Sequence, residues 1–97
     1  MRRDDVIQKL RQHSRRLAED YGVQSLALFG SVARDEETDT SDVDVLVDFG
    51  APPTFDQYMG LNIFLEDLFQ CRVDVVTRRA LKERVRSYVE KEAVRVM

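Results

Sequence analysis

Hydrophobic residues recur along the chain at two different spacings, which predict helices alternating with strands. Val6, Leu10 and Leu17 fall on one face of a helix that we expect over residues 4–21. The run VDVLVDF at 43–49 is rich in β-branched side chains and alternates apolar with polar positions, which favours a strand. The expected elements are, in chain order, a helix at 4–21, a strand at 23–30, a short helix from 31, a strand at 43–49, a helix at 55–69, a strand at 72–77 and a helix at 79–93.

The same pattern indicates how the later helices begin and which sides they bury. Thr54 and Gln57 have the spacing of a capping box at the start of the helix at 55–69. Helices alternating with strands predict an α/β (α+β) domain whose small sheet is covered by helices mainly on one face, and we expect a single domain over 1–97. The buried side of the last helix is expected to carry Leu81, Val85, Tyr88, Val89 and Val96.

Composition narrows the classes of function. The 97 residues are 43% hydrophobic, and 15 basic against 18 acidic side chains give a net charge of −3. This balance gives no overall field to hold a nucleic acid, so we expect no direct nucleic-acid binding. No apolar run approaches the ~18 residues that span a bilayer, so no membrane partner is expected. Cys71 is the single cysteine, which excludes an internal disulfide and makes a cytoplasmic location the expectation.

A glycine and a serine stand where the strand at 23–30 gives way to the short helix. Gly30 lets another group approach the backbone closely. Backbone N–H groups at such a turn, together with the Ser31 hydroxyl, can bind phosphate oxygens. A plain capped turn is the commoner role of a Gly-Ser pair, so the pair alone does not establish a phosphate site.

Three aspartates are candidates for a divalent metal site. Asp42 and Asp44 are two residues apart on one strand, so their side chains project on the same face. Asp74 has a valine on either side in RVDVVT and meets the pair if the two strands are neighbours. Three such carboxylates can hold two divalent ions for in-line phosphoryl or nucleotidyl transfer, with Asp74 as general base or metal ligand on the side of the attacking hydroxyl. The alternative is a merely solvated polar face, because Asp48 has the same spacing.

These features together resemble the signature of the DNA polymerase β-like nucleotidyltransferase superfamily, and of its minimal nucleotidyltransferases in particular. The resemblance lies in GSVARDEETDTSDVDVLVDF, where Gly-Ser precedes an Asp-x-Asp pair, and in VDVVT, which carries the third aspartate. It implies the nucleotidyltransferase fold, with a small mixed sheet of about three strands. It also implies Mg²⁺, with two ions bound, and ATP as the substrate.

The resemblance gives a role to each matched residue. Gly30 and Ser31 would contact the β- and γ-phosphates of a nucleoside triphosphate. Asp42 and Asp44 would bind Mg²⁺, and Asp74 would complete the catalytic and metal-binding triad.

The chain departs from the family pattern at one position. Family members often carry GSxARG, and the arginine, here Arg34, can pair with triphosphate oxygens. Asp35 stands where glycine frequently follows that arginine, and this places an extra negative charge near the expected phosphates.

The resemblance also implies a partner. Many minimal nucleotidyltransferases are similar to antitoxins that transfer AMP from ATP to a tyrosine hydroxyl of a HEPN-domain RNase toxin and silence it. A core this small has no second domain to position an acceptor, which agrees with an acceptor on another chain in a hetero-oligomer. Two alternatives stay open: a catalytically weak antitoxin that neutralises its partner by binding, and a nucleotidyltransferase that acts on a small molecule or an RNA.

Residues 78–97 are rich in positive charge, with seven basic against three acidic side chains. They are either a solvated amphipathic face or a docking face for an acidic or nucleotide-bearing partner. The seven basic residues of this segment are Arg78, Arg79, Lys82, Arg84, Arg86, Lys91 and Arg95.

Overall fold

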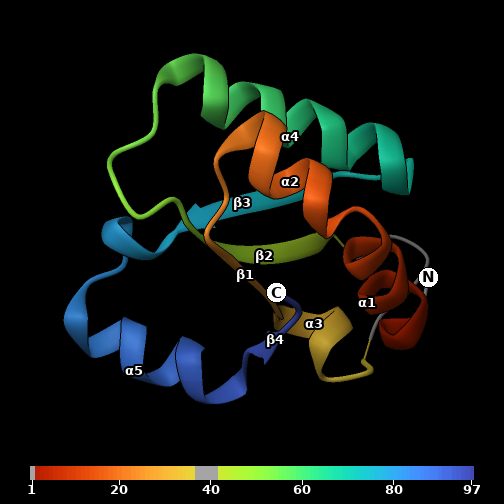
Figure 1. Cartoon of the computed structure of the whole chain (residues 1–97). Helices are drawn as coiled ribbons and strands as arrows, with labels where there is room; N and C mark the ends of the chain where they lie inside the picture. The colour runs from red at the N-terminus through yellow and green to blue at the C-terminus, as the bar shows by residue number, and fades with distance from the viewer. Residues whose placement is uncertain (1, 37–41) are drawn as a thin grey trace.

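The computed structural model describes residues 2–36 and 42–97, and its helices and strands follow the predicted order (Figure 1). The prediction of a helix at 55–69 with its capping box is confirmed. The Thr54 hydroxyl accepts from the backbone N–H of Gln57 at 3.1 Å, and the Gln57 side chain accepts from the N–H of Thr54 at 2.9 Å. The elements are α1 (Arg3–Gln12), α2 (Ser14–Tyr21), β1 (Ser25–Phe29), α3 (Gly30–Ala33), β2 (Val43–Asp48), α4 (Phe55–Phe69), β3 (Val73–Thr77), the 3₁₀ turn η1 (Arg78–Ala80), α5 (Glu83–Glu92) and β4 (Val94–Arg95).

The strands form one mixed sheet of four strands in the order β3-β2-β1-β4. β2 runs parallel to β3, and β1 runs antiparallel to both β2 and β4. The α+β class and the mixed sheet are therefore as expected, but the fourth strand is additional. β4 pairs only with Ala27 and Leu28 of β1. A strand of two residues is too short to show an alternating pattern, which is why the sequence did not reveal it.

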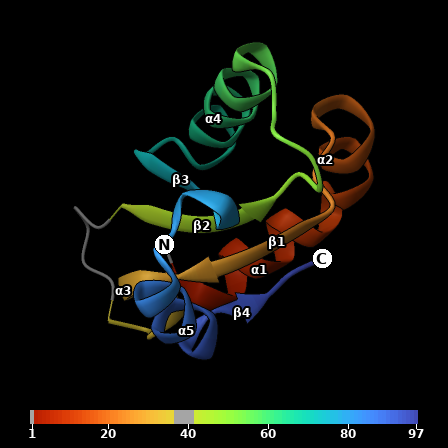
Figure 2. The same ribbon diagram turned by 90° about the vertical axis from the view of Figure 1, so that its left-hand side faces the viewer.

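The hydrophobic core lies on one side of the sheet. Alternate residues of β2, Val43, Val45 and Val47, are buried, and they form one cluster with Leu61 and Leu65 of α4. Figures 1 and 2 show α2 and α4 on this side of the sheet and α5 on the other. The intervening β2 residues consequently point away from the core, toward the side that α5 only partly covers.

The prediction of one helix over 4–21 is wrong, because the helix breaks at His13. The N–H of His13 bonds to the carbonyl of Leu10, three residues back, at 3.2 Å, and its ring stacks edge-on against Phe64. The apolar stripe continues into α2 at Leu17, so hydrophobic spacing could not reveal the break. No helix in 2–36 and 42–97 has both the length and the apolar content needed to cross a membrane.

The last predicted helix is also divided, and its predicted buried side is partly wrong. η1 and α5 are separate because Leu81 and Lys82 are extended between them. Val89 is buried, but Val85 is 43% exposed and Tyr88 is 65% exposed. The physical reason is that α5 lies over the sheet face opposite the core, across a cavity whose lining mixes apolar, polar and charged side chains, so little apolar surface covers these residues.

The outer edge of β3 is closed by side chains of α4. The Tyr58 hydroxyl donates to the carbonyl of Val75 at 2.8 Å, and the Asn62 amide donates to the carbonyl of Val73 at 3.0 Å. These bonds satisfy edge groups of the sheet and fix the position of β3 relative to α4.

Candidate active site

At the turn between β1 and α3, the backbone of Gly30 lies close to the carboxylate of Asp44. Gly30 has φ +78°, and a Cβ at this position would overlap the Oδ2 atom of Asp44. Glycine is therefore required here both by the left-handed backbone and by the close approach of β2. Ser31 lies in the first turn of α3, one residue too late to be the N-cap residue of this helix, which is Phe29. Its hydroxyl is consequently not used to cap the helix.

The sheet register places two of the predicted aspartates directly opposite each other. Asp44 of β2 pairs with Asp74 of the parallel strand β3, and on its other side it pairs with Phe29, the residue before Gly30. The flanking valines of both strands are buried, so both carboxylates project from the sheet face opposite the core. The condition stated from the sequence, that the two strands be neighbours, is met.

The electrostatics of Asp44 reflect this crowding. Partial burial raises the pKa of the Asp44 carboxyl above its ordinary value, and the charges of Asp74 and then Asp42 raise the pKa further. Arg34 acts in the opposite direction, with the smallest effect on that pKa. A cation placed between the carboxylates would relieve this repulsion.

The three aspartates lie at the same end of the sheet, but their carboxylates alone do not form a complete metal-binding site. Asp42 lies one residue before β2 begins. Within the described residues, no three histidine, cysteine or acidic side chains are grouped closely enough to hold a metal ion. Mg²⁺ in nucleotide enzymes commonly takes one or two carboxylates and completes its octahedron with phosphate oxygens and water. The hard oxygen donors of Asp44 and Asp74 fit this mode of binding.

Arg34 is close to the site, but in this structure it contacts acidic residues. Its Nε lies 3.2 Å from Glu36, and its Nη1 lies 3.3 Å from Glu92 at the end of α5. The hydrogen bond to Glu36 is the main cause that raises the pKa of Arg34. Glu92 was not expected from the sequence, because it is far from Arg34 along the chain and no local pattern connects the two.

The next residue, Asp35, adopts φ +61°, a backbone conformation that favours glycine. Asp35, which stands where family members often have glycine, therefore occupies a position with a left-handed backbone. Aspartate is one of the few residues that tolerate this conformation, because its short polar side chain can hydrogen-bond locally.

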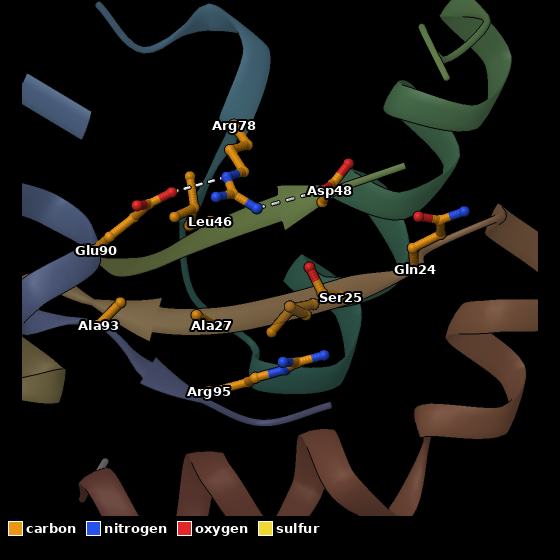
Figure 3. Close-up of a pocket in the computed structure, with 10 residues that line it drawn as sticks. Gln24, Ser25, Ala27, Leu46, Asp48, Arg78, Glu90, Ala93 and Arg95 are labelled. Carbon is orange, nitrogen blue, oxygen red and sulfur yellow. Dashed lines mark ion pairs between the residues drawn. The ribbon is translucent and has the colours of Figure 1, made fainter. Parts of the chain in front are cut away.

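A cavity of about 370 Å³ opens on the same sheet face, between β1, β2 and α5 (Figure 3). Leu46, two residues after Asp44 on β2, contributes to its lining. Arg78 lies between two acids at one side of the cavity, with its Nε 2.7 Å from Glu90 and its Nη1 3.8 Å from Asp48 (Figure 3). The sequence indicated Asp48 as a residue of the polar face, but it did not indicate its pairing with Arg78.

Comparison with known proteins identifies the domain type. Residues 10–96 match the nucleotidyltransferase domain family. The chain is 37% identical over 93 residues to the protein adenylyltransferase MntA of Thermococcus cleftensis, an alignment that covers 96% of this chain and 94% of MntA.

Solved structures agree with that assignment. A protein proposed to be a minimal nucleotidyltransferase superposes with a TM-score of 0.82 at 35% identity, covering 97% of this chain and 95% of that chain. A toxin–antitoxin complex with AMP-PNP contains a chain with a TM-score of 0.75 at 20% identity, covering 90% of this chain and 72% of that chain. At that identity the second match shows a shared fold.

Proposed function

Because the chain belongs to the nucleotidyltransferase domain family, we propose that it transfers AMP from ATP to a tyrosine hydroxyl of a HEPN-type toxin and thereby acts as the antitoxin. Membership of the family makes it a nucleotidyltransferase. The observation that carries the proposal is the in-register placement of Asp44 and Asp74 beside the bare backbone of Gly30. The two carboxylates supply oxygen ligands for a metal ion. The adjacent backbone at Gly30 can supply N–H groups that donate hydrogen bonds to a triphosphate.

In this proposal Asp42, Asp44 and Asp74 hold Mg²⁺. When bound there, the metal neutralises phosphate charge and lowers the pKa of an attacking hydroxyl. Asp74 is exposed and lies on β3, at the outer side of the pair, so the acceptor hydroxyl approaches from its side. It either takes the proton of that hydroxyl or orients the hydroxyl for attack on the α-phosphate, where the new bond to the acceptor oxygen replaces the bond to the β-phosphate and pyrophosphate leaves.

Gly30 and Ser31 bind the β- and γ-phosphates in this proposal. The absence of a side chain at Gly30 leaves room at the Asp44 carboxylate, and the Ser31 hydroxyl is a donor that no helix cap uses. Arg34 pairs with the triphosphate after leaving Glu92, because one guanidinium cannot keep both acids and also bind phosphate in a bidentate manner.

A protein acceptor agrees with the relatives. MntA is named a protein adenylyltransferase, and one chain of the toxin–antitoxin complex with AMP-PNP shares the fold of this chain. Exposed apolar side chains on α5, Val85 and Tyr88, offer contact area for a partner chain. The same two side chains favour one second candidate function, neutralisation of the toxin by binding alone.

The test is AMP transfer to a purified HEPN-type toxin from the same organism, measured by intact mass with ATP and Mg²⁺. We expect one or more adenylyl groups on the toxin with the wild-type chain and none with Asp44→Asn or Asp74→Asn. Asp67→Asn, the same chemical change on the exposed face of α4, is the matched control and should retain transfer. If the aspartate variants neutralise the toxin fully without modifying it, binding alone is the function.

A further inference from the structure

Three arginines gather at the end of the sheet away from the three aspartates. Arg78 and Arg79 belong to η1, directly after β3, and Arg86 lies on α5. Together with Gln24, Asp48 and Gly50 they line a cavity of about 310 Å³. Asp48 ends β2 four residues after Asp44, a separation of ~13 Å along the strand. This cavity is therefore distinct from the proposed nucleotide site.

The charges around this cavity are not balanced. Arg78 is paired with Asp48 and Glu90, as Figure 3 shows from the side of the neighbouring cavity. Arg79 and Arg86 form no ion pair with any residue of 2–36 and 42–97. Two guanidinium groups consequently line one small cavity without a carboxylate of their own.

The hydrogen bonds of these two side chains are also incomplete. Arg79 makes one long contact, 3.5 Å from its Nη2 to the carbonyl of Gly50. Arg86 donates from Nη2 to the carbonyl of Leu81 at 3.4 Å, while its buried Nε finds no acceptor among the described residues. A buried donor without a partner is rare in native proteins and commonly indicates a missing water or ion.

We propose that this arginine cavity binds a phosphate group. Guanidinium forks match phosphate oxygens in a bidentate manner, and two unpaired forks balance a phosphate dianion better than a single carboxylate. The Gln24 amide lies against Gly50 at the rim of the cavity and adds a neutral donor. A single phosphate group fits the observations better than a polynucleotide backbone, because the chain as a whole carries a charge of −3.

The binding test uses the full chain carrying Asp44→Asn, so that the proposed nucleotide site does not contribute. Inorganic phosphate and AMP are titrated separately by calorimetry, and a short single-stranded RNA is the third ligand. We expect phosphate and AMP to bind with similar Kd values on the order of millimolar, and the RNA to bind no more tightly per phosphate group. Tight binding of RNA with a steep salt dependence would instead assign the cavity to nucleic acid and overturn the proposal.

Variants identify the side chains responsible. Arg79→Gln with Arg86→Gln should weaken phosphate binding at least tenfold, whereas Arg84→Gln with Lys91→Gln, an equal loss of charge on exposed positions of α5, should change the Kd less than twofold. Because Arg86 is half-buried, Arg79→Gln alone is measured as well and should also weaken phosphate binding. Arg79 is exposed, so we expect this variant to keep the fold. Equal weakening by both double variants would show a general charge effect and refute the site. These outcomes do not depend on whether the chain transfers AMP.

Discussion

Replacing Gly30 by alanine tests the central contact of the proposed site. The new Cβ would overlap the Asp44 carboxylate and lie 3.0 Å from its Cγ and 3.2 Å from its Cβ. Rotation of the Asp44 side chain moves the carboxylate but leaves its Cβ in place, so β2 itself must shift. Gly50→Ala is the matched control, because Gly50 has nearly the same backbone angle, φ +76° against +78°. There the new Cβ meets only the end of the flexible Gln24 side chain.

Both variants lose stability because alanine is placed in a left-handed backbone conformation, and only Gly30→Ala also loses stability through crowding against β2. An alanine in the left-handed region costs roughly 1–2 kcal/mol, of which about half a kcal/mol is recovered through the lower entropy of the unfolded chain. We therefore expect Gly50→Ala to lower the free energy of unfolding by about 1 kcal/mol. Crowding against a fixed backbone adds about 1–2 kcal/mol in Gly30→Ala. For a domain of this size, 1 kcal/mol corresponds to a shift in Tm of about 4–8 °C.

The assays are thermal unfolding followed by circular dichroism and titration of AMP-PNP with Mg²⁺ by calorimetry, well below the lower Tm. Gly30→Ala should lose about 8 °C or more and weaken the nucleotide Kd at least tenfold, since Asp44 no longer occupies its position. Gly50→Ala should lose about 5 °C and keep the wild-type Kd of the Mg²⁺-dependent binding, because Gly50 lines the separate arginine cavity and not the site of Asp44.

Two results would refute this reasoning. If Gly30→Ala binds nucleotide as tightly as the wild type, the approach of Gly30 to Asp44 is not part of the nucleotide site. If Gly50→Ala loses binding to the same degree, the loss reflects general destabilisation rather than the position of Asp44.

Three further substitutions follow from the same structure. Asp44→Asn should raise the free energy of unfolding in metal-free buffer by roughly 0.5–1 kcal/mol, because it removes a like charge opposite Asp74; a decrease measured by urea denaturation would contradict the electrostatic picture. Asp35→Gly should stabilise the chain by a few tenths of a kcal/mol, since φ +61° suits glycine; the Tm should rise slightly, and a clear fall would show that the Asp35 side chain makes a stabilising contact. Thr54→Ala should cost about 1 kcal/mol through loss of the N-cap of α4, and urea denaturation with an unchanged midpoint would show that the capping box carries no stability.

The sequence predicted what depends on local pattern. The helix over Phe55–Phe69, the alternation in β2 and the placement of Asp44 and Asp74 on one face all follow from spacing along the chain. The neighbouring position of β2 and β3 could be stated only as a condition, because strand order arises from tertiary packing.

Three features lay beyond such patterns for physical reasons. The break at His13 accompanies a tertiary contact of its ring with Phe64, and a continuous apolar stripe hides it. β4 is too short for periodicity. The pairing of Arg34 with Glu92 joins residues 58 positions apart, and only the folded chain brings them together.

The bonds from Tyr58 and Asn62 to the carbonyls of β3 also affect how the molecule can associate. An open sheet edge recruits foreign strands through its free backbone groups, and this is a common beginning of aggregation. Two of these acceptors on β3 are already taken by side chains of a helix that is firmly packed on the core. A partner that approaches this flank therefore meets helix side chains instead of a template for strand pairing. Strand addition is therefore disfavoured where these carbonyls are bonded, and the opposite edge of the sheet is β4, which pairs with β1 over only two residues.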